Sequence, residues 1–317
     1  MNTIKKIGLT ALAGSLVATS AYAGSLDVTG GASLKYTSED SDEVTGNPFT
    51  MGRGITFSGS GDVNGMAMNY FYIMDDAAFS SSGLSLDMGD NGTISFENGG
   101  AGTGIASMKD KIAIAGGEQA YDDMGATDHG LSSFPTKGTF GYKNVYEGYT
   151  VSAAWNKNGS TSTGGAIAAG ENGSSKSIAI SGDVADGLNM GIGYGDVAKT
   201  GESKAETQAT IYGQYAYGGA LISLQTTSID KPTGTSDTDS VGMGITCLVN
   251  ENLSIGISRL DVDFNDASKS DEESIAVGAS YTMGSMSVSA STADKDGVAG
   301  SKTADDKHTE VTLSFAF

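Results

Sequence analysis

Apolar and polar residues alternate along most of this chain. The first clear case is residues 26–36, a stretch about as long as a β-strand that crosses a bilayer at a tilt. Its two faces differ: one carries Leu26, Val28, Leu34 and Tyr36, and the other carries Asp27, Thr29, Ser33 and Lys35. This two-residue period predicts a strand with one apolar and one polar face.

The pattern recurs and predicts sixteen strands, joined alternately by short turns and longer polar loops. Asn64-Gly65 and Asn91-Gly92 mark two of the short turns, because glycine accepts the positive φ that hairpin turns need. The longer loops are expected at 37–51, 75–83, 98–138, 158–176, 196–206, 228–239, 261–272 and 292–307. This order is typical of an all-β, antiparallel up-and-down barrel spanning an outer membrane, and sixteen strands leave an aqueous channel.

The first 23 residues are expected to be a cleaved signal peptide rather than part of the fold. Lys5 and Lys6 precede an apolar run over 7–18, and the segment ends in Ala21-Tyr22-Ala23, an A-x-A cleavage signature. The barrel would then occupy 24–317, with a formal charge of 16 − 38 = −22. No later run reaches the roughly 18 apolar residues of a membrane-spanning helix.

Composition narrows the function further. The chain has 47 glycines and 3 prolines, which suits strands and tight turns, and Cys247 is the single cysteine, so no internal disulfide can form. The strong negative charge argues against nucleic acid as a partner. It leaves open that acidic loops bind divalent cations.

A soluble secreted β-protein would also show a two-residue period. The apolar parity here, however, carries many aromatic residues near strand ends: Tyr36, Phe57, Tyr72, Phe96, Tyr142, Tyr149, Trp155, Tyr194, Tyr215, Tyr281 and Phe317. That placement matches the aromatic girdles of membrane barrels and favours the barrel interpretation.

Four segments in order carry a resemblance: GSLDVTGGASLKY after the signal peptide, RGITFSGSGDVNG, GDNGTISFENGG before the longest loop, and the terminal VTLSFAF. Together they resemble the sixteen-stranded general diffusion porins of Gram-negative bacteria, particularly the alphaproteobacterial type, over the whole mature chain. The resemblance implies a homotrimer in the outer membrane, set among lipid and lipopolysaccharide. It also implies passive diffusion of small hydrophilic solutes and ions, a third loop (98–138) folded inward as the constriction, and recognition of the Phe317 strand by the barrel-assembly machinery.

The chain departs from that family in its basic residues. Such porins commonly set an arginine-rich wall against an acidic third loop, whereas this chain has two arginines, Arg53 and Arg259. Glu97-Asn98-Gly99 stands where the strand before the third loop often continues into Gly-Arg.

Loop 98–138 supplies the predicted acidic side of the constriction: Asp110, Glu118, Asp122, Asp123 and Asp128. Carboxylates in a narrow passage favour cations. The predicted basic wall consists of Lys35 and Lys143, which have lumen parity, and Arg53, which shares the parity of Ile55 and whose direction stays open. The alternative is that the acids are ordinary solvated loop charges.

Weaker candidates concern metals and catalysis. Asp261, Asp263, Asn265 and Glu272 partly match an EF-hand calcium loop, but the glycine at its sixth position is absent and strands flank it. Loose binding of divalent cations such as Ca²⁺, bridging lipopolysaccharide, is the open alternative, and no other cofactor is expected. Gly100 to Gly104 lacks a βαβ context, and His129 and His308 form no constellation by themselves.

We therefore expect a non-enzymatic, cation-preferring diffusion porin in the outer membrane. A substrate-selective channel on the same barrel is the alternative, and it would show saturable conductance block by one solute. An outer-membrane enzyme or adhesin is less consistent with this strand number and with so few histidines.

Overall fold

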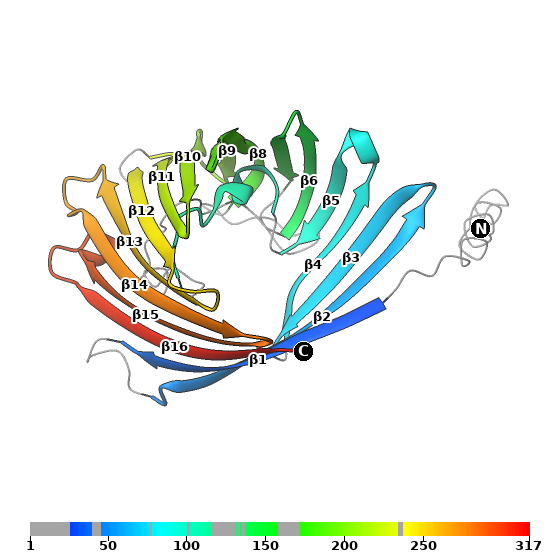
Figure 1. Ribbon diagram of the computed structural model, residues 1–317. Coiled ribbons are helices and arrows are strands. Elements are labelled where there is room, and N and C mark those ends of the chain that lie inside the picture. The colour runs from blue at the N-terminus through cyan, green and yellow to red at the C-terminus, as the bar shows by residue number, and fades with distance from the viewer. Residues whose placement is uncertain are drawn as a thin grey trace.

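The sixteen predicted strands form one closed antiparallel barrel (Figure 1). The computed structural model describes residues 26–39, 46–76, 78–99, 102–115, 131, 134, 137–157, 172–233 and 237–317. The strands are β1 Leu26–Ser38, β2 Phe49–Val63, β3 Met66–Asp75, β4 Ala78–Asp87, β5 Thr93–Asn98, β6 Lys137–Tyr146, β7 Tyr149–Asn156, β8 Asn172–Ala185, β9 Leu188–Lys199, β10 Ala205–Tyr217, β11 Ala220–Asp230, β12 Thr238–Leu248, β13 Leu253–Phe264, β14 Glu272–Met283, β15 Met286–Asp296 and β16 Asp306–Ala316. Short 3₁₀ turns lie at η2 Gly89–Asn91, η3 Gly104–Met108 and η5 Val298–Gly300.

Pairing of the first and last strands closes the cylinder. Leu34 lies opposite Leu313 and Tyr36 opposite Val311 in the antiparallel ladder of β1 and β16. At the end of the chain, the Phe317 N–H donates to the Gly30 carbonyl at 2.9 Å, and the Gly30 N–H donates to the Phe317 carbonyl at 2.8 Å. Closure leaves no open sheet edge, which a membrane would not tolerate.

The two faces of the barrel wall carry the chemistry that the alternation predicts. Outward side chains are apolar and exposed: Leu224 is 55% exposed, Ile192 57% and Ile257 51%. Aromatic rings pack against one another on this face, as in Phe96 with Phe140, whose ring centroids are 4.8 Å apart. A soluble sandwich buries its apolar face, so this arrangement contradicts the soluble alternative and matches a lipid-facing belt.

The described part of the chain contains no helix with the length and hydropathy needed to cross a membrane.

Two-residue turns join several hairpins as predicted. Asn64 and Gly65 have φ values of 56° and 83°, and Glu147 and Gly148 have 48° and 86°. Positive φ at both central positions gives a turn whose twist matches that of the flanking strands.

The strands extend further than the sequence pattern indicates. The predicted loop 75–83 is mostly strand, because β3 ends at Asp75 and β4 begins at Ala78. The predicted loops 261–272 and 292–307 also begin inside strands, since β13 continues to Phe264 and β15 to Asp296. Hydrogen bonding continues there although the outward positions have become polar, as at Asp261, Asp263 and Asp294, while Val262 stays buried on the inward face. The predicted signal peptide, 1–23, lies outside the described residues.

Candidate pore lining and inner segment

One stretch of the predicted third loop lies against the inner wall of the barrel. We call residues 102–115 the inner segment; it includes η3, which Figure 1 shows inside the ring of strands. A Cβ atom added at Gly193 would lie 2.9 Å from Ile105, and one added at Gly242 would lie 2.8 Å from Ile112. Both glycines have the parity opposite to the exposed apolar residues, so the segment contacts the polar, inward face.

Serine and glutamine side chains of the wall bind the backbone of this segment. The Gly104 N–H donates to Ser152 Oγ at 2.7 Å, and the Ile105 N–H donates to Ser177 Oγ at 3.1 Å. Gln225 donates from Nε2 to the Met108 carbonyl at 2.8 Å and accepts from the Lys111 N–H at 3.3 Å. These bonds satisfy backbone groups that have no ladder partner.

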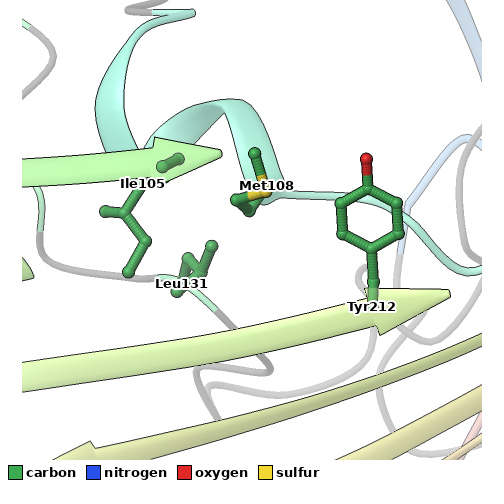
Figure 2. Close-up of a cluster of buried hydrophobic side chains, with 5 residues drawn as sticks. Ile105, Met108, Leu131 and Tyr212 are labelled. Atoms are coloured by element: carbon green, nitrogen blue, oxygen red, sulfur yellow. The ribbon is translucent and has the colours of Figure 1, made fainter. Parts of the chain in front are cut away.

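Apolar contacts fix the same segment. Ile105 and Met108 of η3 are 0% and 2% exposed, and they pack with Leu131, Ala179 and Tyr212. Figure 2 shows the two η3 side chains directed toward Leu131, with Tyr212 rising from the wall beside Met108. A buried apolar cluster is not expected in the polar interior of a membrane barrel, so this cluster indicates a specific docking site.

Inward glycines make room for docked residues of loop 98–138. Gly191 and Gly193 on β9 and Gly242 on β12 face side chains of the inner segment, and Gly195 on β9 faces Phe134. Gly244 on β12, Gly256 on β13 and Gly278 on β14 face the backbone of the inner segment. A Cβ at Gly244 would collide with the Ala113 carbonyl, and one at Gly278 with the Ala115 carbonyl. This docking surface was not among the sequence predictions, although glycine at every second position of 191–195 was a signal that could have located it.

Of the predicted constriction acids, the structure describes Asp110. Lys109 and Asp110 are exposed, and Asp110 has a φ of 55°. The neighbouring Lys111 lies with its Nζ 5.4 Å from the centre of the Tyr212 ring. Burial lowers the pKa of Lys111, and the charge of Asp110 opposes that shift. Glu118, Asp122, Asp123 and Asp128 lie outside the described residues.

The three predicted basic wall residues have different surroundings. Lys35 is on the inner face and forms a 2.6 Å ion pair with Glu310 of β16. Lys143 is also on the inner face and is exposed. Arg53 shares the parity of Ile55 and forms a 3.2 Å ion pair with Asp76 near the end of β3, and it also borders the cavity of about 820 Å³ between β1, β2, β3 and β16.

The structure does not bring the four candidate metal ligands together. Asp261 has outward parity and pairs with Arg259 at 2.9 Å, and Asp263 shares that face. Glu272 is 1% exposed on the inner face and pairs with Lys295 at 3.3 Å. Asn265 lies in the outer loop. Among the residues that the structure describes, no group of three or more His, Cys, Asp or Glu is arranged to hold a metal ion.

The wall formed by β1, β2, β3 and β16 carries small side chains. A cavity of about 820 Å³ lies there, lined by residues that include Gly31, Gly52, Gly54 and Asp75. A second cavity of about 500 Å³ lies along β1–β5 and is lined by Asp27, Phe71 and Glu97 among others. The start of the inner segment reaches the second cavity, because the Gly102 N–H donates to Glu97, and the rest of the segment lies along other strands.

No known protein family and no curated protein matches the sequence. Solved structures do. A porin refined at 1.8 Å resolution aligns with a TM-score of 0.71 at 14% identity, covering 92% of this chain and 100% of that chain. The fold is that of the sixteen-stranded porins.

Other porins superpose in the same way. The anion-selective porin of Comamonas acidovorans aligns with a TM-score of 0.67 at 15% identity, covering 93% of this chain and 100% of that chain. A triple mutant of the Rhodopseudomonas blastica porin gives a TM-score of 0.66 at 13% identity, covering 92% and 100%. The porin fold predicted from the sequence is thus confirmed over nearly the whole chain.

Proposed function

We propose that this protein is an outer-membrane diffusion channel for small hydrophilic solutes and ions. The observation that carries the proposal is the inversion of the barrel: apolar side chains are exposed outside, and polar side chains and small cavities line the inside. Such a wall is stable in lipid and encloses water. The porin fold supports the same conclusion.

The inner segment makes the lumen narrower without filling it. It lies along the wall of β7–β14, held by the bonds to Ser152 and Gln225, while cavities remain along β1–β5. We propose that this part of the third loop sets the size limit of the channel. Loop 98–138 as a whole would then be the constriction loop that the sequence predicts.

We propose a modest preference for cations. Asp27, Asp75 and Glu97 face the lumen on β1–β5, and Lys137 and Lys143 lie on the neighbouring strand β6. Lys109 and Lys111 of the inner segment oppose this field. The balance of these groups favours K⁺ over Cl⁻, and the field of the lumen acts on every permeating ion.

The route to the membrane and the assembly are further parts of the proposal. Residues 1–23 would direct export and be removed, and Phe317, which is 78% exposed, would be read by the barrel-assembly machinery. The barrel would form a homotrimer among lipid and lipopolysaccharide. Divalent cations such as Ca²⁺ would bind loosely at its acidic outer loops, and no catalytic role is proposed.

The second candidate function is a substrate-selective channel on the same barrel. The observation that favours it is the cavity on β1–β5, which is lined by the aromatic ring of Phe71 together with polar and acidic side chains. A selective channel would show saturable block of ion current by its solute, whereas a general channel would not.

Liposome swelling tests the proposed channel. Liposomes containing the purified barrel should swell in solutions of neutral sugars, at rates that fall steeply as the sugar becomes larger. Protein-free liposomes and liposomes with heat-unfolded protein are the controls. Swelling no faster than in these controls would contradict the proposal.

A further inference from the structure

A continuous row of inward positions crosses the first five strands at one height. The Cα partners in the ladder run from Asp27 to Ser58, then to Phe71, Gly83 and Glu97. Because each strand lies about 4.8 Å from the next, these side chains form one line along the wall. The row lines the cavity of about 500 Å³.

Phe71 is the unusual member of this row, because its strand otherwise directs aromatic residues outward. Its ring lies over Gly83, where an added Cβ would lie 2.8 Å from Cζ of the ring and even closer to Cε1. No side chain therefore separates the ring from Glu97, which is the next position along the row. Phe71 is only partly buried, so the ring remains accessible from the lumen.

Glu97 lines the same cavity as this ring, one strand beyond Gly83. Its Oε2 accepts a hydrogen bond from the Gly102 N–H at 3.1 Å. One carboxylate oxygen is thus anchored by the start of the inner segment. The position of the Glu97 carboxylate is therefore fixed by a backbone group of the docked loop.

The lining of the cavity decides which chemistry fits. Asp27 and Glu97 contribute negative charge, and Ser58, Ser60, Asn69 and Ser85 contribute polar groups. Among the described residues that line the cavity there is no lysine, arginine or histidine. An aromatic face beside a carboxylate attracts a cation through the ring quadrupole and through Coulomb interaction. A bare metal ion would make little use of the ring, whereas an organic ammonium group would use both.

We propose that Phe71 and Glu97 form a binding subsite for small organic cations of the quaternary ammonium class. The cation would lie against the Phe71 ring with Glu97 as its counter-ion, in the path of solutes that cross the lumen. The proposal rests on the channel function proposed above and adds a ligand class to it.

The test uses choline chloride as the probe. Potassium current through the full-length mature barrel in a planar bilayer is recorded at constant KCl while choline is added. We expect saturable block by choline, and we expect the half-blocking concentration to rise about tenfold in Phe71→Leu and in Glu97→Gln, as for loss of a partly desolvated cation–π or ionic contact. Glu97→Gln removes the negative charge but keeps an acceptor for the Gly102 N–H. A loss of block in this variant therefore reports the charge of Glu97 and not its role in holding the loop.

Tyr72→Leu is the matched control, because Tyr72 is the next residue on β3 and its side chain lies on the outward face against Phe79. Choline should block the Tyr72→Leu channel at the same half-blocking concentration as the wild-type channel. Three results would overturn the proposal: no choline block, equal block in wild type and both inner-face variants, or block by glucose at the same concentrations as choline. In each of these three results the channel still conducts KCl. Absence of any conductance would instead contradict the proposed channel function.

Discussion

Replacing Ile105 with aspartate is expected to increase the current fluctuations of the open channel. Ile105 is 0% exposed in the cluster that fixes η3 to the wall. Burying the Ile105 side chain contributes about 1.5–3 kcal/mol, whereas burying an unpaired carboxylate there would cost at least several kcal/mol. The inner segment of Ile105→Asp should therefore leave the wall and move in the lumen.

Single-channel recording measures this effect directly. Open-channel current fluctuations should rise severalfold in Ile105→Asp, while the strand ladder and the heat resistance of the barrel persist. The control is Ile105→Leu, which keeps the volume and apolar character of the side chain. Identical current noise in the two variants would mean that the docked segment does not control the aqueous path.

Replacing Lys295 with methionine will destabilise the barrel far more than a surface charge replacement. Lys295 and Glu272 form an ion pair in which both side chains are 0% exposed. Glu272 also accepts from the Ala299 N–H at 2.9 Å, which ties the β15–β16 loop to β14. Removing one partner of a buried pair typically costs about 3–5 kcal/mol, because the remaining charge stays buried.

The urea midpoint of unfolding in detergent provides the measurement. Lys295→Met should unfold at clearly lower urea, and the double replacement Glu272→Gln with Lys295→Met should recover much of the loss. Lys307→Met is the matched control, since its 3.0 Å pair with Asp294 is more than half exposed on both sides. Exposed pairs contribute about 1 kcal/mol or less. Equal midpoints for Lys295→Met and Lys307→Met would refute the assigned role of the buried pair.

The strands and their faces could be predicted from the sequence because a two-residue period is a local property. Leu34 and Lys35 are adjacent, and their opposite directions follow from the pleat alone. Parity left the direction of Arg53 open, and the structure pairs it with Asp76. Strand ends were less predictable, since outer portions such as 261–264 carry polar residues on the outward face and apolar ones, Val262 and Phe264, on the inward face, which reverses the pattern.

The candidate site depended on register between strands, which the sequence does not state. Glu272 was grouped with Asp261 by sequence spacing, but its partner is Lys295 on the neighbouring strand. The docking surface for the inner segment likewise combines Ser152, Gln225 and Gly278 from strands far apart in the chain. Only the closed barrel brings such positions together.

Reversal potential in a planar bilayer under a KCl gradient tests the central claim most directly. The account predicts stepwise conductance increases as barrels insert, with a reversal potential whose sign shows that K⁺ permeates more readily than Cl⁻. Anion preference would show that Lys109, Lys111 and Lys143 dominate the lumen field. Absence of conductance from correctly folded, inserted barrels would contradict the channel itself.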